Sequence, residues 1–188
     1  YAQLGTLEFA EMGAAAASAD RRVLWVGAVL LLIGFGAKAG AFPLHIWLPT
    51  AHPAAPAPAS AVLSGVITKT GIYGVLVLST TIFLHNGTWG LVLAAIGAIT
   101  MVLGAGLAVC SVDLKRTLAC SSISQIGFIL VGTAMQCLLG EHNALAVDGT
   151  ILHIVNHSLI KMVLFPLAGV IHLSTHSFDL NDIRGFGR

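Results

Sequence analysis

The sequence predicts an all-α fold, a polytopic bundle of about five transmembrane helices with broken helices beside buried lysines. Composition is the first observation: 56% of the 188 residues are hydrophobic and only 9% are charged, whereas a soluble domain carries about a quarter charged residues. The second is the length of the apolar runs, because a helix needs about 20 residues to cross a bilayer. The third is that lysines lie inside these runs.

Five segments are long and apolar enough to span a membrane. We expect spans at residues 23–48, 60–84, 89–110, 117–139 and 146–173. The proline-rich link TAHPAAPAPAS, from Thr50, is expected to be extended or turning rather than helical. HNGT from His85 and GEHN from Gly140 are polar turns. SVDLKRT is a charged loop that contains Lys115, and its Asp113 is suited to cap the next helix.

The chain divides into residues 1–22, an interfacial helix and connector, and residues 23–188, the core part of the transmembrane domain. A short interfacial helix is expected within residues 5–17. The sequence begins at Tyr1 and stops at GFGR, so we expect both ends to be cuts through a longer protein. If the spans alternate in direction, Arg21 and Arg22 lie on one side. The other side holds Lys115, Arg116, Arg184 and Arg188, and the positive-inside rule places it in the cytoplasm.

Three of the four lysines lie in apolar surroundings: Lys38 in GFGAKAG, Lys69 in GVITKTGIYG and Lys161 in HSLIKMVLF. A charged lysine at the bilayer centre costs about 2.5–3.5 kcal/mol on insertion scales, so such residues usually face protein or a wet cavity. Snorkelling to the headgroups is the alternative for a lysine near a helix end. Lys69 and Lys161 lie too far inside their segments for that, which favours a functional interpretation.

The carboxylates do not supply partners for these lysines. All eight acidic residues fall in loops, flanks or segment ends. Either the lysines are neutral for part of the time, because desolvation disfavours the charged form, or their carboxylate partner lies in a part of the protein not present here. Both alternatives make the lysines exchange protons readily, which a proton relay requires.

The last span carries a second polar line, in ILHIVNHSLIKMVLF. His153, His157 and Lys161 are spaced i, i+4, i+8 and therefore lie along one helical face. Histidine both donates and accepts protons near neutral pH. One alternative is a metal bound by the two histidines, although the neighbouring lysine would repel a cation. Another is a structural role, in which the histidines hydrogen-bond across a helix interface. We expect no metal and no cofactor.

Helix breakers accompany the lysines. Gly40 and Pro43 follow Lys38, and Pro166 follows Lys161. A proline inside a span frees a carbonyl that protein or water must satisfy, and transporters use broken helices near ion sites. We expect the break beside Lys38 to open a small hydrated pocket. Polar residues of the fourth span are candidates to hold water between the lysines, or to join helices. They are Ser121, Ser122, Ser124, Gln125, Thr133 and Gln136.

Three blocks carry a family resemblance. KAGAFPLHIWLPTAHPAAPAPASAVLSGVITKTGIYG begins at Lys38, DLKRTLACSSISQIGFILVG at Asp113 and HIVNHSLIKMVLFPLAG at His153. In this order and spacing they resemble the antiporter-like subunits of respiratory complex I, of multisubunit cation/proton antiporters and of membrane-bound energy-converting hydrogenases. The resemblance covers about residues 25–188.

The resemblance implies a transmembrane bundle with an axis of ionisable groups along the membrane plane. It implies that Lys38 is the lysine of a broken helix, normally paired with a glutamate on an earlier helix, and that Lys69 is the connecting lysine. It implies that His153, His157 and Lys161 lead towards the exit side. The partner glutamate and a terminal lysine or glutamate on a later broken helix are not in this sequence.

The predicted function is translocation of protons or sodium ions through these five residues. The chain would be a multi-pass subunit of a redox-driven or antiporter complex in a prokaryotic inner membrane, with other membrane subunits and lipid as partners and no nucleic acid. The absence of a CxxC cluster and of a nucleotide-binding loop disfavours a metal or redox enzyme in its own right. The resemblance implies a non-redox subunit of a proton-translocating oxidoreductase of the NADH:quinone or hydrogenase type. The alternative is a non-transporting structural subunit with the same fold.

Overall fold

The computed structural model describes residues 4–6 and 8–185, and the described residues form helices and no strand. The helices are α1 (Phe9–Ser18), α2 (Arg21–Ala39), α3 (Trp47–Ala54), α4 (Ala57–Val62), the π-helical segment η1 (Leu63–Ile67), α5 (Thr68–Thr81), α6 (Gly87–Val109), α7 (Leu114–Leu138), the 3₁₀ turn η2 (Gly140–His142) and α8 (Ala144–Thr175).

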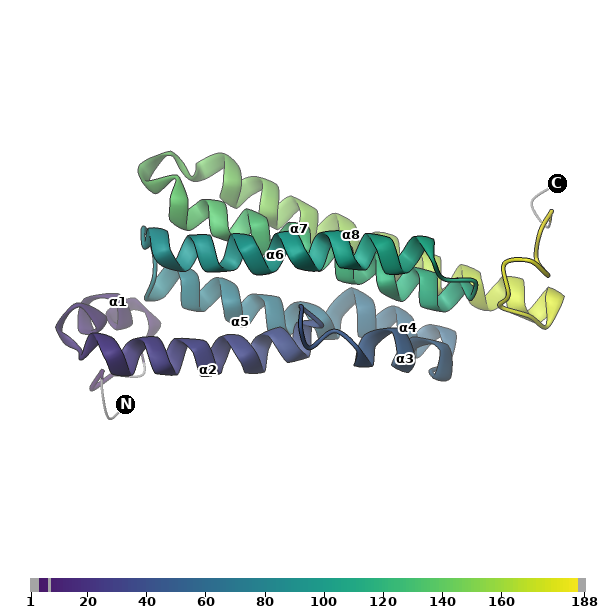
Figure 1. Cartoon of the computed structure of the whole chain (residues 1–188), viewed down its shortest axis with the longest axis horizontal. Coiled ribbons are helices and arrows are strands. Elements are labelled where there is room, and N and C mark those ends of the chain that lie inside the picture. Colours follow the sequence, from purple (N-terminus) through teal and green to yellow (C-terminus); the bar gives the residue numbers. More distant parts are fainter. Residues whose placement is uncertain (1–3, 7, 186–188) are drawn as a thin grey trace.

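Within the described residues, five helical stretches are long and apolar enough to cross a membrane, as predicted. They are Arg21–Ala39, Ala57–Thr81, Gly87–Val109, Leu114–Leu138 and Ala144–Thr175. They run roughly parallel or antiparallel to one another and form an elongated bundle (Figure 1). The all-α transmembrane fold class is therefore confirmed. The predicted cap of α7 is also confirmed, since the Asp113 carboxylate accepts a hydrogen bond of 2.7 Å from the Arg116 backbone N–H.

The first predicted span is interrupted after Lys38. Helix α2 ends at Ala39, and Gly40 takes a left-handed conformation with φ 79°, which glycine adopts at little steric cost. The backbone N–H groups of Gly40 and Ala41 both donate to Gly36 O at 2.9 Å. The chain turns and resumes as α3 at Trp47. The predicted helix break is confirmed, and residues 23–48 comprise most of α2, a turn and the start of α3 rather than one helix.

The proline-rich link is largely helical, so the prediction of an extended segment from Thr50 is wrong. Helix α3 runs to Ala54, and α4 begins at Ala57. Pro56 is the N-cap of α4 and Pro58 lies in its first turn, where the missing proline N–H has no intrahelical acceptor to lose. Pro56 and Pro58, at the start of α4, therefore permit a second short helix, and Pro53 is tolerated in the last turn of α3.

The break expected at Pro166 does not occur, because α8 continues through it to Thr175. The irregular backbone lies instead in η1, a π-helical segment directly before Lys69. Such segments frequently occur at functional sites in helices. The sequence gives no proline at this position, and η1 was not predicted.

Helices α6 and α7 pack so closely that glycine is required between them. A Cβ atom on Gly104 would lie 2.8 Å from Ser124 Cα, and one on Gly127 would lie 2.7 Å from Met101 Cα. Small residues allow this approach of backbones in membrane helices. The contact fixes α7, the helix that contributes most serines to the site described below.

The two ends of the bundle carry different connections. Helix α1 and the turn between α5 and α6 lie at one end, whereas the loop before α7 and the last described residues lie at the other (Figure 1). The helix expected within residues 5–17 forms as α1; its position at the membrane interface stays a prediction. The arrangement separates Arg21 and Arg22 from the loop before α7. The predicted orientation is otherwise untested, and Arg188 lies outside the described residues.

Candidate functional site

Lys69 is buried next to the π-helical segment and bonds to it. Its ammonium donates a hydrogen bond of 2.5 Å to Ser64 O, and the Thr68 hydroxyl donates to the same oxygen at 3.0 Å. Lys69 is 9% exposed and Ser64 is fully buried. The irregular backbone of η1 thus presents a carbonyl oxygen to a lysine that would otherwise lie in an apolar interior.

Ser121 and Ser122 of α7 lie between this lysine and the second buried lysine, and the Ser122 hydroxyl donates a hydrogen bond of 3.0 Å to Leu118 O. The hydroxyl groups of Ser64 and Ser122 are 2.8 Å apart and hydrogen-bonded. The Lys161 ammonium of α8 donates to Ser121 Oγ at 2.5 Å and to Leu118 O at 2.8 Å. Adjacent residues of α7, Ser121 and Ser122, therefore lie near both lysines. The hydrogen-bond acceptors of the two lysine ammonium groups are the Ser121 hydroxyl and backbone carbonyls, not carboxylates.

The residues His153, His157 and Lys161, called here the α8 stripe, lie along one face of α8 directed towards α7. His157 and Lys161 are each 3% exposed. The ring centroids of His153 and His157 are 6.4 Å apart with nearly parallel planes, and His153 lies 5.9 Å from the ring of Phe128 on α7.

His157 and Lys161 face the bundle interior, whereas His153 is only half-buried. Beside the stripe, Val155 and Met162 are 52% and 45% exposed, and Met162 also lies against Gly65 of η1. Neither ring nitrogen of His157 has a hydrogen-bond partner in the part of the chain that the structure describes, nor has Nε2 of His153. Buried polar groups of this kind are usually paired with protein or with ordered water.

Lys38 lies apart from the other predicted site residues. It is in the last turn of α2 and is exposed in this chain, so the expectation that it is buried is wrong for the described residues. The reason is that the outer face of α2 has no helix packed on it, as the exposed side chains of Val26, Leu30 and Ile33 also show.

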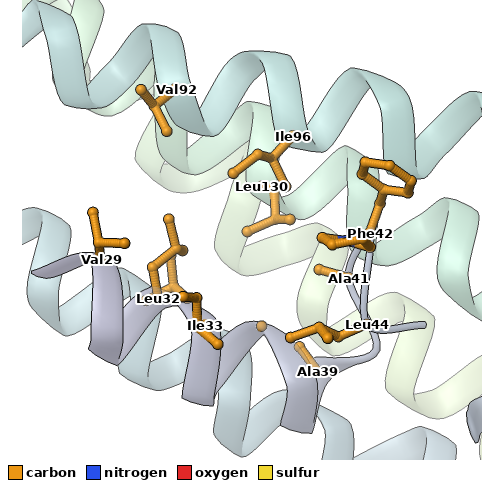
Figure 2. Close-up of a pocket in the computed structure, with 13 residues that line it drawn as sticks. Val29, Leu32, Ile33, Ala39, Ala41, Phe42, Leu44, Val92, Ile96 and Leu130 are labelled. Carbon is orange, nitrogen blue, oxygen red and sulfur yellow. The ribbon is translucent and has the colours of Figure 1, made fainter. Parts of the chain in front are cut away.

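The break beside Lys38 does not open the hydrated pocket that we expected. The cavity at the break has a volume of about 370 Å³ and is lined by apolar side chains of α2, α6 and α7 and of the 41–44 turn. Figure 2 shows Leu32, Phe42, Ile96 and Leu130 around it. Lys38 is not among the lining residues. Pro43, in the turn that follows the helix break, thus borders an apolar cavity that Lys38 does not line.

Lys115 is the site residue whose surroundings the sequence did not indicate. Instead of a solvated loop it occupies the first turn of α7, and it is only 4% exposed. Its ammonium donates to Ala55 O at 2.8 Å and lies 4.4 Å from the centroid of the Phe178 ring. Lys115 therefore joins the α3–α4 link, the start of α7 and the segment after α8.

The metal alternative for His153 and His157 finds no further ligand. Within residues 4–6 and 8–185, no three histidine, cysteine or acidic side chains come together as a metal site. Two histidines alone would leave a zinc ion short of protein ligands.

Comparison with known proteins agrees with the family resemblance seen in the sequence. Residues 1–188 match the family described as NADH:quinone oxidoreductase/Mrp antiporter, TM. The chain is 44% identical over 160 residues to hydrogenase-4 component B of Escherichia coli (strain K12), which covers 81% of this chain and 24% of that protein. It is 40% identical over 184 residues to NAD(P)H-quinone oxidoreductase chain 4 1 of Synechococcus sp. (strain JA-3-3Ab); the match covers 97% of this chain and 34% of that protein.

Two solved structures have the same fold over most of the chain. One is the Mrp complex from Dietzia sp. DQ12-45-1b, with a TM-score of 0.80, 30% identity, and coverage of 90% of this chain and 30% of that one. The other is the membrane-bound sulfane sulfur reductase, an archaeal respiratory membrane complex. Its TM-score is 0.83 with 27% identity, and the match covers 98% of this chain and 37% of that one. The chain spans between 24% and 34% of the length of these two curated relatives.

Proposed function

Because the chain belongs to the NADH:quinone oxidoreductase/Mrp antiporter transmembrane family, we propose that it conducts protons through Lys69, Lys161, His157 and His153. The named relatives and structural neighbours are components of membrane complexes. We therefore place this chain in a multisubunit membrane complex that is driven by a redox reaction or exchanges cations for protons. Other membrane subunits would be its partners, and lipid its surroundings.

The observation that carries this proposal is the connection between the two buried lysines through α7. Lys69 bonds to the backbone of Ser64, the Ser64 and Ser122 hydroxyls bond to each other, and the Ser122 hydroxyl and the Lys161 ammonium both donate to Leu118 O. Hydroxyl groups donate and accept hydrogen bonds at once, so they are able to order water molecules between two ammonium groups. A scaffold would gain more stability from leucine than from buried lysines, because a buried charge requires compensating partners.

Proton transfer, rather than sodium transfer, fits the chemistry of these groups. An ammonium group releases one proton and becomes a neutral amine with a lone pair, which accepts the next proton. A neutral imidazole accepts a proton at one ring nitrogen and releases one from the other. Sodium ions, as hard cations, prefer several oxygen ligands, and lysine would repel them.

Lys38 requires a partner that would cover the exposed face of α2. A lysine facing lipid at this depth is costly, and the outward position of its side chain agrees with a second helix lying there in the whole protein. We assign to that helix the carboxylate that Lys38 needs. With this partner, Lys38 would bind and release the proton that Lys69 receives.

The test is replacement of both histidines of the stripe in the full-length protein. The double variant His153→Phe/His157→Phe keeps aromatic bulk and removes the four ring nitrogens. Proton uptake by proteoliposomes that contain the whole complex should fall by about ten-fold or more, since a positioned proton-transfer group contributes a factor of about 10²–10⁴. Assembly on native gels should stay normal. The matched control is Asn156→Ala, at an exposed position of the same helix, which should keep the wild-type rate.

Normal proton uptake by the double variant would remove the stripe from the pathway. If Lys161→Leu also assembled and transported normally, the chain would be a structural subunit rather than a conductor.

A further inference from the structure

A third imidazole continues the α8 stripe beyond Lys161. Phe165 is four residues after Lys161, so it occupies the next position on the same helical face, and its side chain is fully buried. The ring of His52, from α3, stacks on Phe165 with a centroid distance of 4.5 Å and an interplanar angle of 13°. His52 therefore lies about one helical turn, or about 5–6 Å of rise, further along α8 than Lys161.

His52 is a buried polar group without a protein partner. It is fully buried, and neither of its ring nitrogens has a hydrogen-bond partner among residues 4–6 and 8–185. Its backbone is held, because His52 O accepts a hydrogen bond of 3.1 Å from Ser60 Oγ of α4. Burial of a polar ring is usually compensated by a protein partner or an ordered water. A fixed ring with two unpaired nitrogens is thus suited to contact water on both sides.

Residues next to the stack in the chain line a cavity at the Lys115 end of the bundle. This cavity has a volume of about 510 Å³, and its lining includes Pro53, Pro166, Lys115 and His172. Pro53 follows His52 in the chain and Pro166 follows Phe165, so the backbone that carries each stacked ring adjoins the lining of the cavity. The Lys115 ammonium, bonded to Ala55 O, lies on the same cavity.

We propose that His52 is a further proton-carrying residue, which connects Lys161 to the cavity beside Lys115. This inference rests on the function proposed above and extends it to the side of the membrane at which the relay opens. Water molecules would link the Lys161 ammonium to one ring nitrogen of His52 and the cavity to the other. A proton released by Lys161 binds the unprotonated ring nitrogen and gives an imidazolium. The proton on the other nitrogen then leaves towards the cavity, which restores a neutral ring in the other tautomer; transfer in the reverse direction follows the same steps.

The experiment compares two substitutions of His52 in the full-length protein within its complex. His52→Phe keeps the aromatic stack on Phe165 and removes both nitrogens. His52→Gln keeps a hydrogen-bonding group but has no nitrogen that binds a proton near neutral pH. Both variants should assemble normally and lose about ten-fold or more of the proton uptake by proteoliposomes. The control is His142→Phe, at an exposed position in η2, which should keep the wild-type rate.

Wild-type transport in either assembled variant would overturn the proposal, since a stacking role survives in the first and a hydrogen-bonding role in the second. If the stripe variant His153→Phe/His157→Phe loses transport while a His52 variant keeps it, the proposed function stands and only the role of His52 fails. If all of these variants transport normally, the proposed function itself is wrong.

A measurement on the unmodified complex decides the matter if the substitutions prevent assembly. The hydrogen on Cε1 of a histidine ring exchanges slowly with deuterium when water reaches the ring, and mass spectrometry of the peptide that contains His52 measures it. We expect exchange at His52 within about ten-fold of the rate at exposed His142. If His52 did not exchange over the time in which His142 exchanges, water would not reach the His52 ring, and the proposal would be refuted.

Discussion

Replacing Gly104 by alanine tests whether the close contact of α6 and α7 fixes the site. The added Cβ would lie closest to Ser124 N, and 2.8 Å from Ser124 Cα and 2.9 Å from Ile123 C, all backbone atoms of α7. Carbon atoms in contact are about 3.5–4.0 Å apart, so the two backbones must separate by at least about 0.7 Å. Overpacking of this kind costs about 1–3 kcal/mol, which reduces the folding equilibrium by a factor of about 5 to 150.

The matched control is Gly106→Ala, two residues further along α6. A Cβ on Gly106 meets no atom within 4 Å, so this substitution should leave stability unchanged or raise it slightly through helix propensity. Unfolding of the purified complex in detergent, followed by temperature or by denaturant, measures both variants. Proton uptake should fall only in Gly104→Ala, because the displaced part of α7 contains Ser121 and Ser122. Equal stability of the two variants would show that the helices separate without cost and would refute the packing argument.

Three further outcomes concern the lysines. Lys38→Ala should abolish or strongly reduce coupled transport while the protein still inserts, and normal pumping in vesicles would contradict its role. Lys69→Arg should assemble but lose transport by about ten-fold or more, since a guanidinium does not release its proton near neutral pH; wild-type turnover would show that deprotonation is not needed. Lys115→Met removes the bond to Ala55 O and the contact with Phe178, and should lower stability by about 1–3 kcal/mol. An unchanged unfolding midpoint would argue against that contribution.

The features that the sequence predicted well are those set by local composition. Long apolar runs predicted the five spans, because a single segment that crosses a bilayer satisfies its backbone hydrogen bonds only as a helix. Gly40 marked the break after α2, and the spacing of His153, His157 and Lys161 gave the face of α8 they share. In each case the cause lies within a few residues of the feature, so no tertiary information was needed.

The features that it missed depend on which helices lie side by side. Lys115 has the sequence surroundings of a loop lysine, but the α3–α4 link and Phe178 cover it. His52 stood in a segment read as a proline-rich loop, and only the stack on Phe165 relates it to Lys161. Lys38, in contrast, has the sequence of a buried residue and is exposed because no helix among the described residues covers the outer face of α2. A single apolar helix carries no signal for which of its faces is covered.

The partners of the buried lysines explain how positive charges persist in this interior without carboxylates. Ser64 O and Leu118 O are backbone carbonyl oxygens. Each has two lone pairs, so it is able to accept a hydrogen bond from a lysine in addition to one from the helix backbone. These acceptors are weaker than a carboxylate, because hydrogen bonds between two charged groups are the strong ones. A lysine bonded to a carbonyl or a serine is therefore stabilised enough to remain in place, yet it is not held in one protonation state by a fixed negative charge. Carboxylate partners at Lys69 and Lys161 would bind the proton more firmly and oppose its release, so replacement of Ser121 by aspartate should slow transport while strengthening the contact with Lys161.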